Sequence, residues 1–368
     1  MTLSGPIVAE RAAAELAAAR ACFLRNDYLP AERHARAALT QARQAGDFAA
    51  QVEALTWLGA ALTQQGHYDE ALEYLHGAVA LSAERGGTPH AGRACNYLAV
   101  VHEELGDFPL AVGYYERGLA EARAHADAEV EIFLLANLGD GLVAHGDHVR
   151  APGVLARAIE CAAAVGDHAH VGYCLCARAR LHAACGADEA ALADLQAAIA
   201  AAERGSSPRI LAEALTALAR HRAAEGDRDA ALAGAERALV LMTRHDIRRE
   251  MFRIHEALAD IHEAFGEYRE ALRHFRELHR LRAGVLDEVL RARVGKLDAR
   301  IAEERARHAE EIAQLRHGEL ARALSEVERQ AQELKELSQR DPLTGVHNRR
   351  HLADRLAAEP SICRCAWP

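Results

Sequence analysis

Histidine is the residue type in this sequence best suited to holding a metal ion or moving a proton, so the spacing of the histidines is considered first. His102, His182 and His262 stand eighty residues apart, in the segments VHEELG, LHAACG and IHEAFG. None of them has a second histidine four residues later, which is the spacing that binds zinc on a protease helix. Equivalent positions of stacked repeats are separated along an array, so we expect these histidines to pack between helices.

Cysteines are the second candidate group. Eight cysteines in 368 residues do not form a disulfide scaffold, and we expect free thiols. Cys161, Cys174, Cys176 and Cys185 could be considered as zinc ligands, but their spacings match no common zinc pattern and alanines surround them. We expect buried packing residues and no metal. The repeats also contain no paired nucleophile and base and no phosphate-binding loop, so no active site is expected there.

A repeat of forty residues organises most of the chain. Segments such as GHYDEALEYL and GDFPLAVGYY begin at regularly spaced glycines, NDYLPAERHA begins at Asn26, and the residue five places after each of these positions is alanine. Glycine or asparagine can take the left-handed conformation that ends a helix, and alanine lets the next helix pack closely. The glycines are Gly66, Gly106, Gly146, Gly186, Gly226 and Gly266, and the alanines are Ala31, Ala71, Ala111, Ala151, Ala191, Ala231 and Ala271.

Upstream of each turn a second helix is predicted. In the second copy it carries Leu55, Leu58, Gly59 and Leu62, and the fourth copy repeats this stripe from Leu135 to Leu142. A bulky residue follows four places after the alanine in most copies. This pattern resembles the tetratricopeptide repeat, with its Leu-Gly step and its alanine after the turn. The bulky residues are Leu75, Tyr115, Leu155, Leu195 and Phe275.

The resemblance has two departures, because the usual repeat is about 34 residues long and ends in proline. We expect lengthened links such as SAERGGTPHAG to absorb the extra residues. Repeats of the HEAT type have a suitable length as well, but the Leu-Gly and alanine placements favour the tetratricopeptide repeat. The expectation is an all-α solenoid of seven repeats over residues 1–282.

A solenoid of this type forms a concave surface from the first helix of each repeat, and such surfaces bind peptides or protein segments. The residues that could contact a partner lie on the helix face opposite the leucine stripe. They are Arg93, Asn96, Asp140, Arg180, Arg220 and Asp260.

Residues 268–340 contain no proline and predict one long helix, with a coiled-coil segment over residues 283–339. Apolar residues recur at alternating steps of three and four in two blocks, and His308, Ile312 and Leu315 break the register between them. The helix either forms a parallel homodimeric coiled coil or folds back on the repeats as a single charged helix. The two blocks are Leu290, Val294, Leu297 and Ile301, then Leu320, Leu324, Val327, Ala331 and Leu334.

The stretch RDPLTGVHNRRHLADRL, which follows that helix, resembles the entry segment of GGDEF domains, the catalytic domains of bacterial diguanylate cyclases. Members of this family join two GTP molecules into cyclic di-GMP with the help of magnesium, and the resemblance implies that Asn348 recognises guanine. The local sequence also predicts a structural role for Asn348 and for Asp341, because each residue precedes a turn or helix whose first backbone N–H groups its side chain can cap. The matching residues are Asp341, Leu343, Thr344, Gly345, Asn348, Arg349 and Arg350.

The remaining catalytic motifs of the GGDEF family do not follow. Neither D-x-D-x-F nor GG(D/E)EF occurs after residue 350, and the last residues read SICRCAWP. Phosphoryl transfer needs carboxylates to hold the metal ion and a loop to hold the phosphates. We therefore interpret residues 340–368 as a truncated GGDEF fragment that is catalytically inactive, and expect no Mg²⁺ or GTP to serve this chain as a cofactor.

Composition limits the possible partners and location. The net charge is −10 with both signs interspersed, so nucleic acid is not an expected partner. No apolar run is long enough to span a membrane, and the first residues lack a secretory leader, so we expect a cytoplasmic protein. The leading hypothesis is the sensory and dimerisation part of a tetratricopeptide-containing diguanylate cyclase. The alternative is a stand-alone adaptor or scaffold protein with a relic GGDEF tail.

Overall fold

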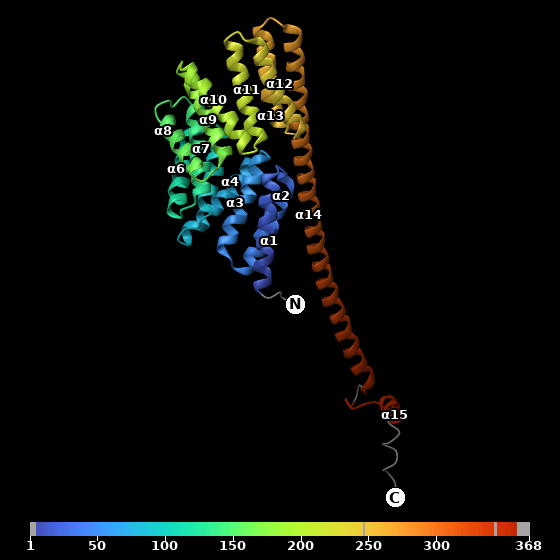
Figure 1. Cartoon of the computed structure of the whole chain (residues 1–368). Coiled ribbons are helices and arrows are strands. Elements are labelled where there is room, and N and C mark those ends of the chain that lie inside the picture. Colours follow the sequence, from blue (N-terminus) through green and yellow to red (C-terminus); the bar gives the residue numbers. More distant parts are fainter. Residues whose placement is uncertain (1–4, 246, 342–343, 359–368) are drawn as a thin grey trace. The chain divides into compact units, whose positions relative to one another are not determined.

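Every regular element in the described part of the chain, residues 5–245, 247–341 and 344–358 of a computed structural model, is an α-helix (Figure 1). The chain separates into two compact units, residues 1–286 and 287–368. Among the described helices, none combines the length and the hydropathy that a bilayer crossing requires. The all-α prediction is therefore confirmed for the described residues.

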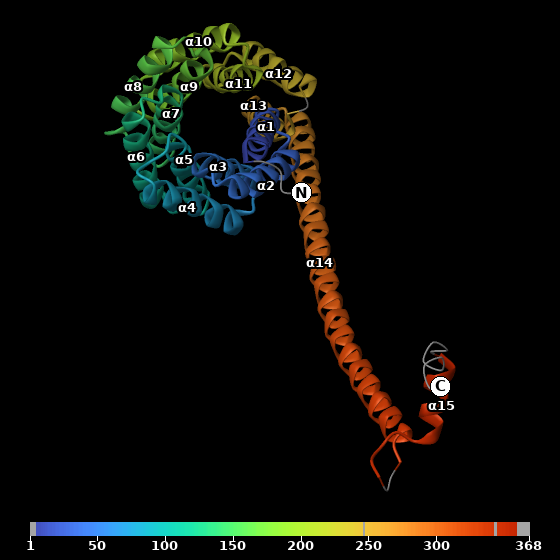
Figure 2. The same ribbon diagram turned by 90° about the horizontal axis from the view of Figure 1, so that it is seen from below.

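The first unit is a row of helix hairpins. Figure 2 shows α3, α5, α7, α9 and α11 on the inside of its curve and α4, α6, α8, α10 and α12 on the outside. The first helices of the hairpins are α1 (Gly5–Leu24), α3 (Phe48–Gln64), α5 (Ala91–Glu104), α7 (Ala128–Ala144), α9 (His168–Ala184), α11 (Pro208–Ala224) and α13 (Arg248–Ala264). Their partners are α2 (Tyr28–Ala45), α4 (Tyr68–Glu84), α6 (Phe108–Ala124), α8 (Ala151–Ala164), α10 (Asp188–Arg204), α12 (Arg228–Arg244) and the start of α14 (Tyr268–Gln339).

The turns between the helices follow the predicted glycine series. Asn26 has φ 63°, and the six repeat glycines from Gly66 to Gly266 have φ between 72° and 85°, so the predicted left-handed conformation is confirmed. A second left-handed series lies halfway between these turns, at Gly46, Gly86, Gly87, Ala126, Gly166 and Ser206.

The repeat of forty residues is thus two half-repeats, and most helices are 17 residues long. The residues in excess of the usual tetratricopeptide length lie mainly in these helices. The expectation that lengthened links absorb them is wrong for most repeats. The links 85–90 and 145–150 are the longer ones, and each adjoins a helix of 14 residues.

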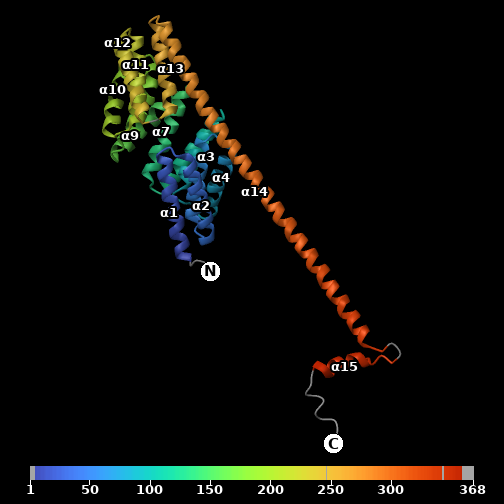
Figure 3. The same ribbon diagram turned by 90° about the vertical axis from the view of Figure 1, so that its right-hand side faces the viewer.

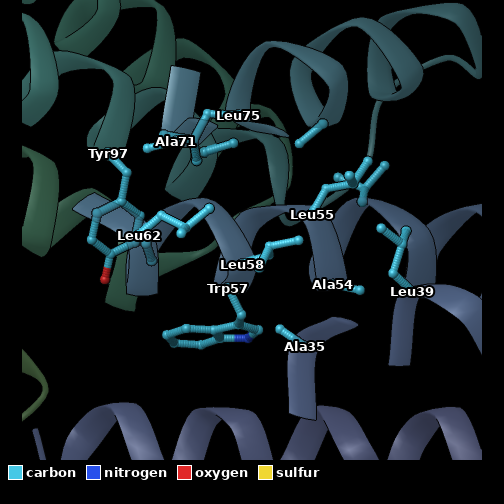
Figure 4. Packing of buried hydrophobic residues seen from close by; sticks show 14 of the residues in the cluster. Ala35, Leu39, Ala54, Leu55, Trp57, Leu58, Leu62, Ala71, Leu75 and Tyr97 are labelled. Atoms are coloured by element: carbon cyan, nitrogen blue, oxygen red, sulfur yellow. The ribbon is translucent and has the colours of Figure 1, made fainter. Parts of the chain in front are cut away.

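The Leu-Gly step and the repeat alanine bring the two helices of a hairpin into close contact. A Cβ atom on Gly59 would lie 2.4 Å from Cγ of Leu75, and Ala71 is fully buried beside it. Figure 4 shows Leu58 and other leucines of α3 beside Ala71 and Leu75 of α4. The same geometry recurs at Gly139, where an added Cβ would lie 2.5 Å from a methyl group of Leu155.

The bulky residue of the repeat is buried in four of the five copies that carry one. Leu75, Tyr115, Leu155 and Leu195 are at most 3% exposed, and Leu75 and Leu155 pack against the first helix of their own hairpins at Gly59 and Gly139. Phe275 at the start of α14 is 51% exposed.

Three histidines meet between α13 and α14. The Nδ1 atoms of His255 and His274 are 3.0 Å apart, and the ring of His262 stacks on His274 with 5.4 Å between centroids. Nδ1 of His262 lies 2.6 Å from a carboxylate oxygen of Glu267. Burial, followed by the charges of His255, Arg273 and His262, lowers the pKa of His274 to about 4.

Acidification is therefore expected to weaken this hairpin. The folded chain keeps His274 neutral down to about pH 4, whereas the unfolded chain binds a proton near pH 6.5. The stabilisation is complete above pH 6.5 and is lost as the pH falls toward 4. Hydrogen-exchange protection factors of α13 at pH 7.5 and 5.0, each corrected for the intrinsic exchange rate at that pH, measure it, and the loss of protection at pH 5.0 is expected to shrink in His274→Gln. An equal loss of protection in the variant would contradict the assignment to His274.

The second unit contains the rest of α14 and α15 (Arg349–Ala358), which follows it after a turn (Figure 3). The apolar side chains of both predicted coiled-coil blocks are exposed on α14 where they are described, and those of Leu290 and Leu297 lie outside the described residues. The coiled coil itself stays a prediction. The exposed residues include Val294, Ile301, Leu320, Leu324, Val327 and Leu334.

Candidate functional site

A cavity of about 350 Å³ opens on the inner side of the hairpins. Its lining comes from six helices, with Phe23 on α1, Gln64 on α3, Asn96 on α5, Asn137 on α7 and Tyr173 on α9. Ser207, Arg209 and Ile210 close it at the beginning of α11. No single repeat forms this site, so its shape depends on how the hairpins stack.

Four rings form an edge-to-face series along the cavity, which we name the aromatic row: Phe23, Tyr97, Phe133 and His170. Successive ring centroids are 5.8, 6.3 and 5.9 Å apart, and the interplanar angles lie between 62° and 90°. Phe23 also packs on Trp57 at 5.4 Å. Edge-to-face pairs at these distances are mutually attractive, so the rings of the row stabilise one another as an aromatic wall.

Two asparagines beside the row form what we name the amide pair. Nδ2 of Asn137 donates a hydrogen bond of 2.9 Å to Oδ1 of Asn96. Asn96 is fully buried, and its own Nδ2 group has no hydrogen-bond partner within the described residues. A buried donor without a partner costs about 1–3 kcal/mol, and the residue that carries this one is among those that line the cavity. A ligand carbonyl beside Asn96 would accept the hydrogen bond that its Nδ2 group does not donate to the described residues.

The charged residues predicted to contact a partner are paired with one another or with their neighbours. Arg93 binds Glu129 at 3.0 Å and lies over the ring of Trp57 at 5.2 Å. The remaining four form two pairs across neighbouring hairpins: Asp140 with Arg180, and Arg220 with Asp260, the second at 3.3 Å.

Asp140 and Arg180 belong to a larger network. The carboxylate of Asp140 also accepts a hydrogen bond of 2.9 Å from the hydroxyl of Tyr173, and Arg180 reaches Glu213 at 3.1 Å. Burial, followed by the charge of Glu213, raises the pKa of Tyr173 well above its usual value. These contacts tie α7, α9 and α11 together at the edge of the cavity.

Of the six residues predicted to contact a partner, Asn96 lines the cavity, and the other five lie on the same set of inner helices in ion pairs. Sequence reasoning missed the aromatic row and Asn137. The forty-residue repeat contained a sequence signal for them. One repeat position is occupied by Trp57, Tyr97 and Asn137. A second repeat position is occupied by Arg93, Phe133 and Tyr173.

The three recurring histidines each contact a residue of their own hairpin. His102 stacks on Tyr114 with 5.3 Å between centroids, and Nε2 of His182 lies 3.5 Å from Asp194. His262 contacts Glu267, as described above. The structure does not bring the three together.

The cysteines considered as zinc ligands do not converge either. Burial raises the pKa of Cys174 to about 12 and that of Cys176 well above its usual value, so both thiols stay protonated and pack as small apolar side chains. Cys161 is half-buried and Cys185 is exposed. A search of the described residues for groups of three or more His, Cys, Asp or Glu side chains suited to a metal ion finds none.

Asn348 and Asp341 cap local structure. Oδ1 of Asn348 accepts a hydrogen bond of 2.9 Å from the backbone of His351 in the first turn of α15, and its Nδ2 donates to Ser338. Oδ1 of Asp341 accepts a hydrogen bond of 3.0 Å from the backbone of Thr344. The capping hypothesis is confirmed for both residues. Guanine recognition by Asn348 stays a prediction, and we assign no catalytic step to this segment.

Comparison with known proteins identifies tetratricopeptide repeats in two segments, residues 51–124 and 254–289. Neither segment includes residues 340–368, so the GGDEF resemblance rests on the sequence motif alone. No curated protein sequence matches this chain.

Several solved structures are similar to the first unit. The apo form of RapI is 12% identical, with a TM-score of 0.60 over 75% of this chain and 99% of that one. The Rap conjugation gene regulator of plasmid pLS20, in complex with the Phr* peptide, is 14% identical, with a TM-score of 0.56 over 73% and 74%. NprR in complex with its cognate peptide NprX is 13% identical, with a TM-score of 0.54 over 78% and 89%. At these identities the likeness shows the fold alone, a helical solenoid that contains tetratricopeptide repeats.

Proposed function

We propose that this chain is a tetratricopeptide-type adaptor or regulator that binds a peptide segment in the cavity of its inner helices. The observation that carries the proposal is the amide pair, where the Nδ2 group of Asn96 is buried on the cavity wall without a partner. A peptide carbonyl would supply the missing acceptor. The proposal favours the adaptor hypothesis over the sensory part of a cyclase.

The similar structures support the same proposal. Two of them, the pLS20 regulator and NprR, are complexes with peptides. Their hairpin solenoids share the fold of this chain, and a concave solenoid surface is a common place for peptide binding.

Asn96→Ala is expected to weaken peptide binding about fivefold to thirtyfold, because the loss of a hydrogen bond in a desolvated site costs about 1–2 kcal/mol. The probe is a fluorescent peptide selected on the wild-type chain from a displayed library of random hexapeptides, and its anisotropy gives Kd. Thr56→Ala is the matched control. Thr56 occupies the position of Asn96 one repeat earlier, and its hydroxyl donates to Val52 within its own helix at 2.8 Å.

Thr56→Ala is expected to leave Kd within about twofold of the wild type. Failure to select any peptide would overturn the proposed function. If the two substitutions changed Kd equally, Asn96 would not be a contact of the peptide.

The sensory and dimerisation part of a diguanylate cyclase is a second candidate function. The exposed apolar residues of α14 favour the homodimer that this hypothesis requires. Leu320, Leu324, Val327 and Leu334 are each more than 60% exposed at coiled-coil spacing. We expect sedimentation velocity to show a homodimer at micromolar concentration and Leu324→Asp with Leu334→Asp to give a monomer. A wild-type monomer would count against pairing through this helix and against the cyclase hypothesis.

A further inference from the structure

We infer that the beginning of α14 binds an acidic amphipathic helix of a partner protein. The surface consists of two lines of exposed side chains, which we name the apolar row and the arginine row. None of these residues lines the cavity of the inner helices, so the inference goes beyond the proposed function. The apolar row is Tyr268, Leu272 and Phe275, and the arginine row is Arg269, Arg273, Arg276 and Arg280.

The apolar row follows one side of the helix, because its residues succeed one another at steps of four and three. Tyr268 is 70% exposed, Leu272 49% and Phe275 51%. On another side of the same helix turns, Leu278 is 2% exposed and His274 contacts α13. The beginning of α14 therefore presents an apolar side to solvent in addition to the side that packs within its own hairpin.

An earlier hairpin shows which kind of element packs against this side. Phe108 on α6 occupies the repeat position of Tyr268, and a Cβ atom on Gly141 of α7 would lie 2.8 Å from its ring. The same ring stacks on His145, which follows α7, with 3.9 Å between centroids. Because α7 is the first helix of the following hairpin, a helix is the element that fits here.

The arginine row lies beside the apolar row, one residue further along the helix at each step. Arg273 and Arg280 each bind a glutamate three residues earlier on α14. Arg269 and Arg276 are exposed and form no ion pair within the described residues. The row thus keeps two positive charges without an ion-pair partner, in a chain whose net charge is −10.

Arginine at these four positions distinguishes the last hairpin from most of those before it. The equivalent positions carry two arginines on α2 and none on α4, α6, α8, α10 or α12. Two of them are acidic on α12, where they are Asp229 and Glu236. The arginine row is therefore not a consequence of the repeat pattern, and it attracts a ligand of opposite charge.

Together the two rows specify the chemistry of the partner. An amphipathic helix can lay its apolar side against the apolar row, and this burial supplies affinity. Carboxylates along one edge of that helix would then face the arginine row and fix its orientation. An anionic membrane surface has related chemistry, but the way α7 covers Phe108 favours a helix.

The test selects peptides on the full-length chain from a displayed library of helical peptides about 18 residues long. Every member has a fixed leucine row at helical spacing, and the flanking positions are randomised among glutamate, glutamine and lysine. We expect glutamate to be enriched along one flank. The Kd of the enriched peptides is expected to rise at least fivefold between 50 and 500 mM NaCl, because salt screens exposed charges.

Reversing the charge of Arg269 and Arg276 tests the arginine row. Arg269→Glu with Arg276→Glu is expected to weaken the glutamate peptides at least tenfold and to strengthen binding of their lysine counterparts. Arg33→Glu with Arg43→Glu is the matched control, because both arginines are exposed on α2 and the net charge changes equally. This control is expected to leave Kd within about twofold.

A second pair of variants tests the apolar row. Phe275→Ala is expected to weaken the enriched peptides at least fivefold. Val240→Ala is its control, since Val240 is an apolar residue of α12 that is 67% exposed, and Kd is expected to stay within about twofold. Equal effects of the two substitutions would overturn the inference, as would equal effects of the two charge reversals.

The remaining outcomes identify other occupants. Enrichment of lysine or glutamine on the flanks, or no enrichment, would overturn the inference. Binding to phosphatidylserine vesicles that the charge reversal abolishes, without peptide enrichment, would assign the surface to a membrane. Peptide binding that falls as the concentration of the chain rises would assign it to a second copy. Asn96→Ala is expected to leave Kd unchanged, so failure here leaves the proposed function standing, and a weakened Kd would place these peptides in the cavity instead.

Discussion

Replacing Gly118 by leucine is expected to lower the free energy of unfolding by about 3 kcal/mol, at the upper end of what overpacking a core costs. Gly118 lies on α6, where that helix meets α5 and α7. A Cβ atom there would lie 2.8 Å from a methyl group of Leu134, 3.0 Å from Cβ of Cys95 and 3.1 Å from the carbonyl oxygen of Gly92. Because one of these neighbours is backbone, the site cannot relax by rotating a side chain. Leucine would force the helices apart.

Gly113 on the same helix gives a matched control. It is exposed, and a Cβ atom built on it meets nothing within 4 Å. Gly113→Leu is therefore expected to raise stability by about 0.8 kcal/mol through helix propensity alone. Urea unfolding followed by circular dichroism compares the two variants, and hydrogen exchange locates the loss in α5 to α7, since a repeat array can unfold in parts. Equal unfolding midpoints would contradict close helix contact at Gly118.

The turns of the solenoid were predictable wherever the sequence uses glycine in register. Gly66 and its equivalents recur at a constant step, and only a residue that tolerates positive φ suits that position. The turns between repeats were expected only as links without a defined register, because Ala126 and Ser206 take the left-handed conformation at two of them, with φ of 52° and 49°. The helix on either side fixes these backbones despite an unfavourable residue. The sequence pattern therefore placed one turn of each repeat at a defined residue and gave the other only as a link between repeats.

The candidate site was less predictable than the fold. Asn96 was a candidate because it stands opposite the leucine stripe of its own helix. Its partners Asn137 and Tyr97, and the ring of Phe23 from the first hairpin, come from separate helices whose relative rotation the repeat pattern does not specify. Polar residues such as Asp140 and Arg180 were candidates for binding because they are charged and face inward. In the structure these two residues bind each other, a pairing across neighbouring repeats that the sequence positions of either residue alone do not reveal.

Arg178→Leu is expected to lower the free energy of unfolding by about 2–3 kcal/mol. Arg178 on α9 donates two hydrogen bonds, of 2.8 and 2.7 Å, to the two carboxylate oxygens of Asp194 on α10. Asp194 is 7% exposed, and the nitrogen Nε2 of His182 lies 3.5 Å from it. Removing the arginine leaves a buried carboxylate with one distant partner, which costs about 3–5 kcal/mol in a fully buried pair. The side chain of Arg178 is 32% exposed, so solvent reduces the expected loss to below that range or to its lower edge.

The double variant Arg178→Leu with Asp194→Leu separates the two ways in which this pair can act. If the loss in the single variant comes from the stranded carboxylate, the double variant regains most of it, because two leucines between α9 and α10 bury apolar surface and leave no charge unpaired. If each side chain stabilises the hairpin on its own, the losses add. Urea unfolding of the wild type, both single variants and the double variant gives the coupling energy, and a value below about 0.5 kcal/mol would contradict direct pairing. A larger coupling would show that this ion pair holds the hairpin through mutual compensation of buried charge.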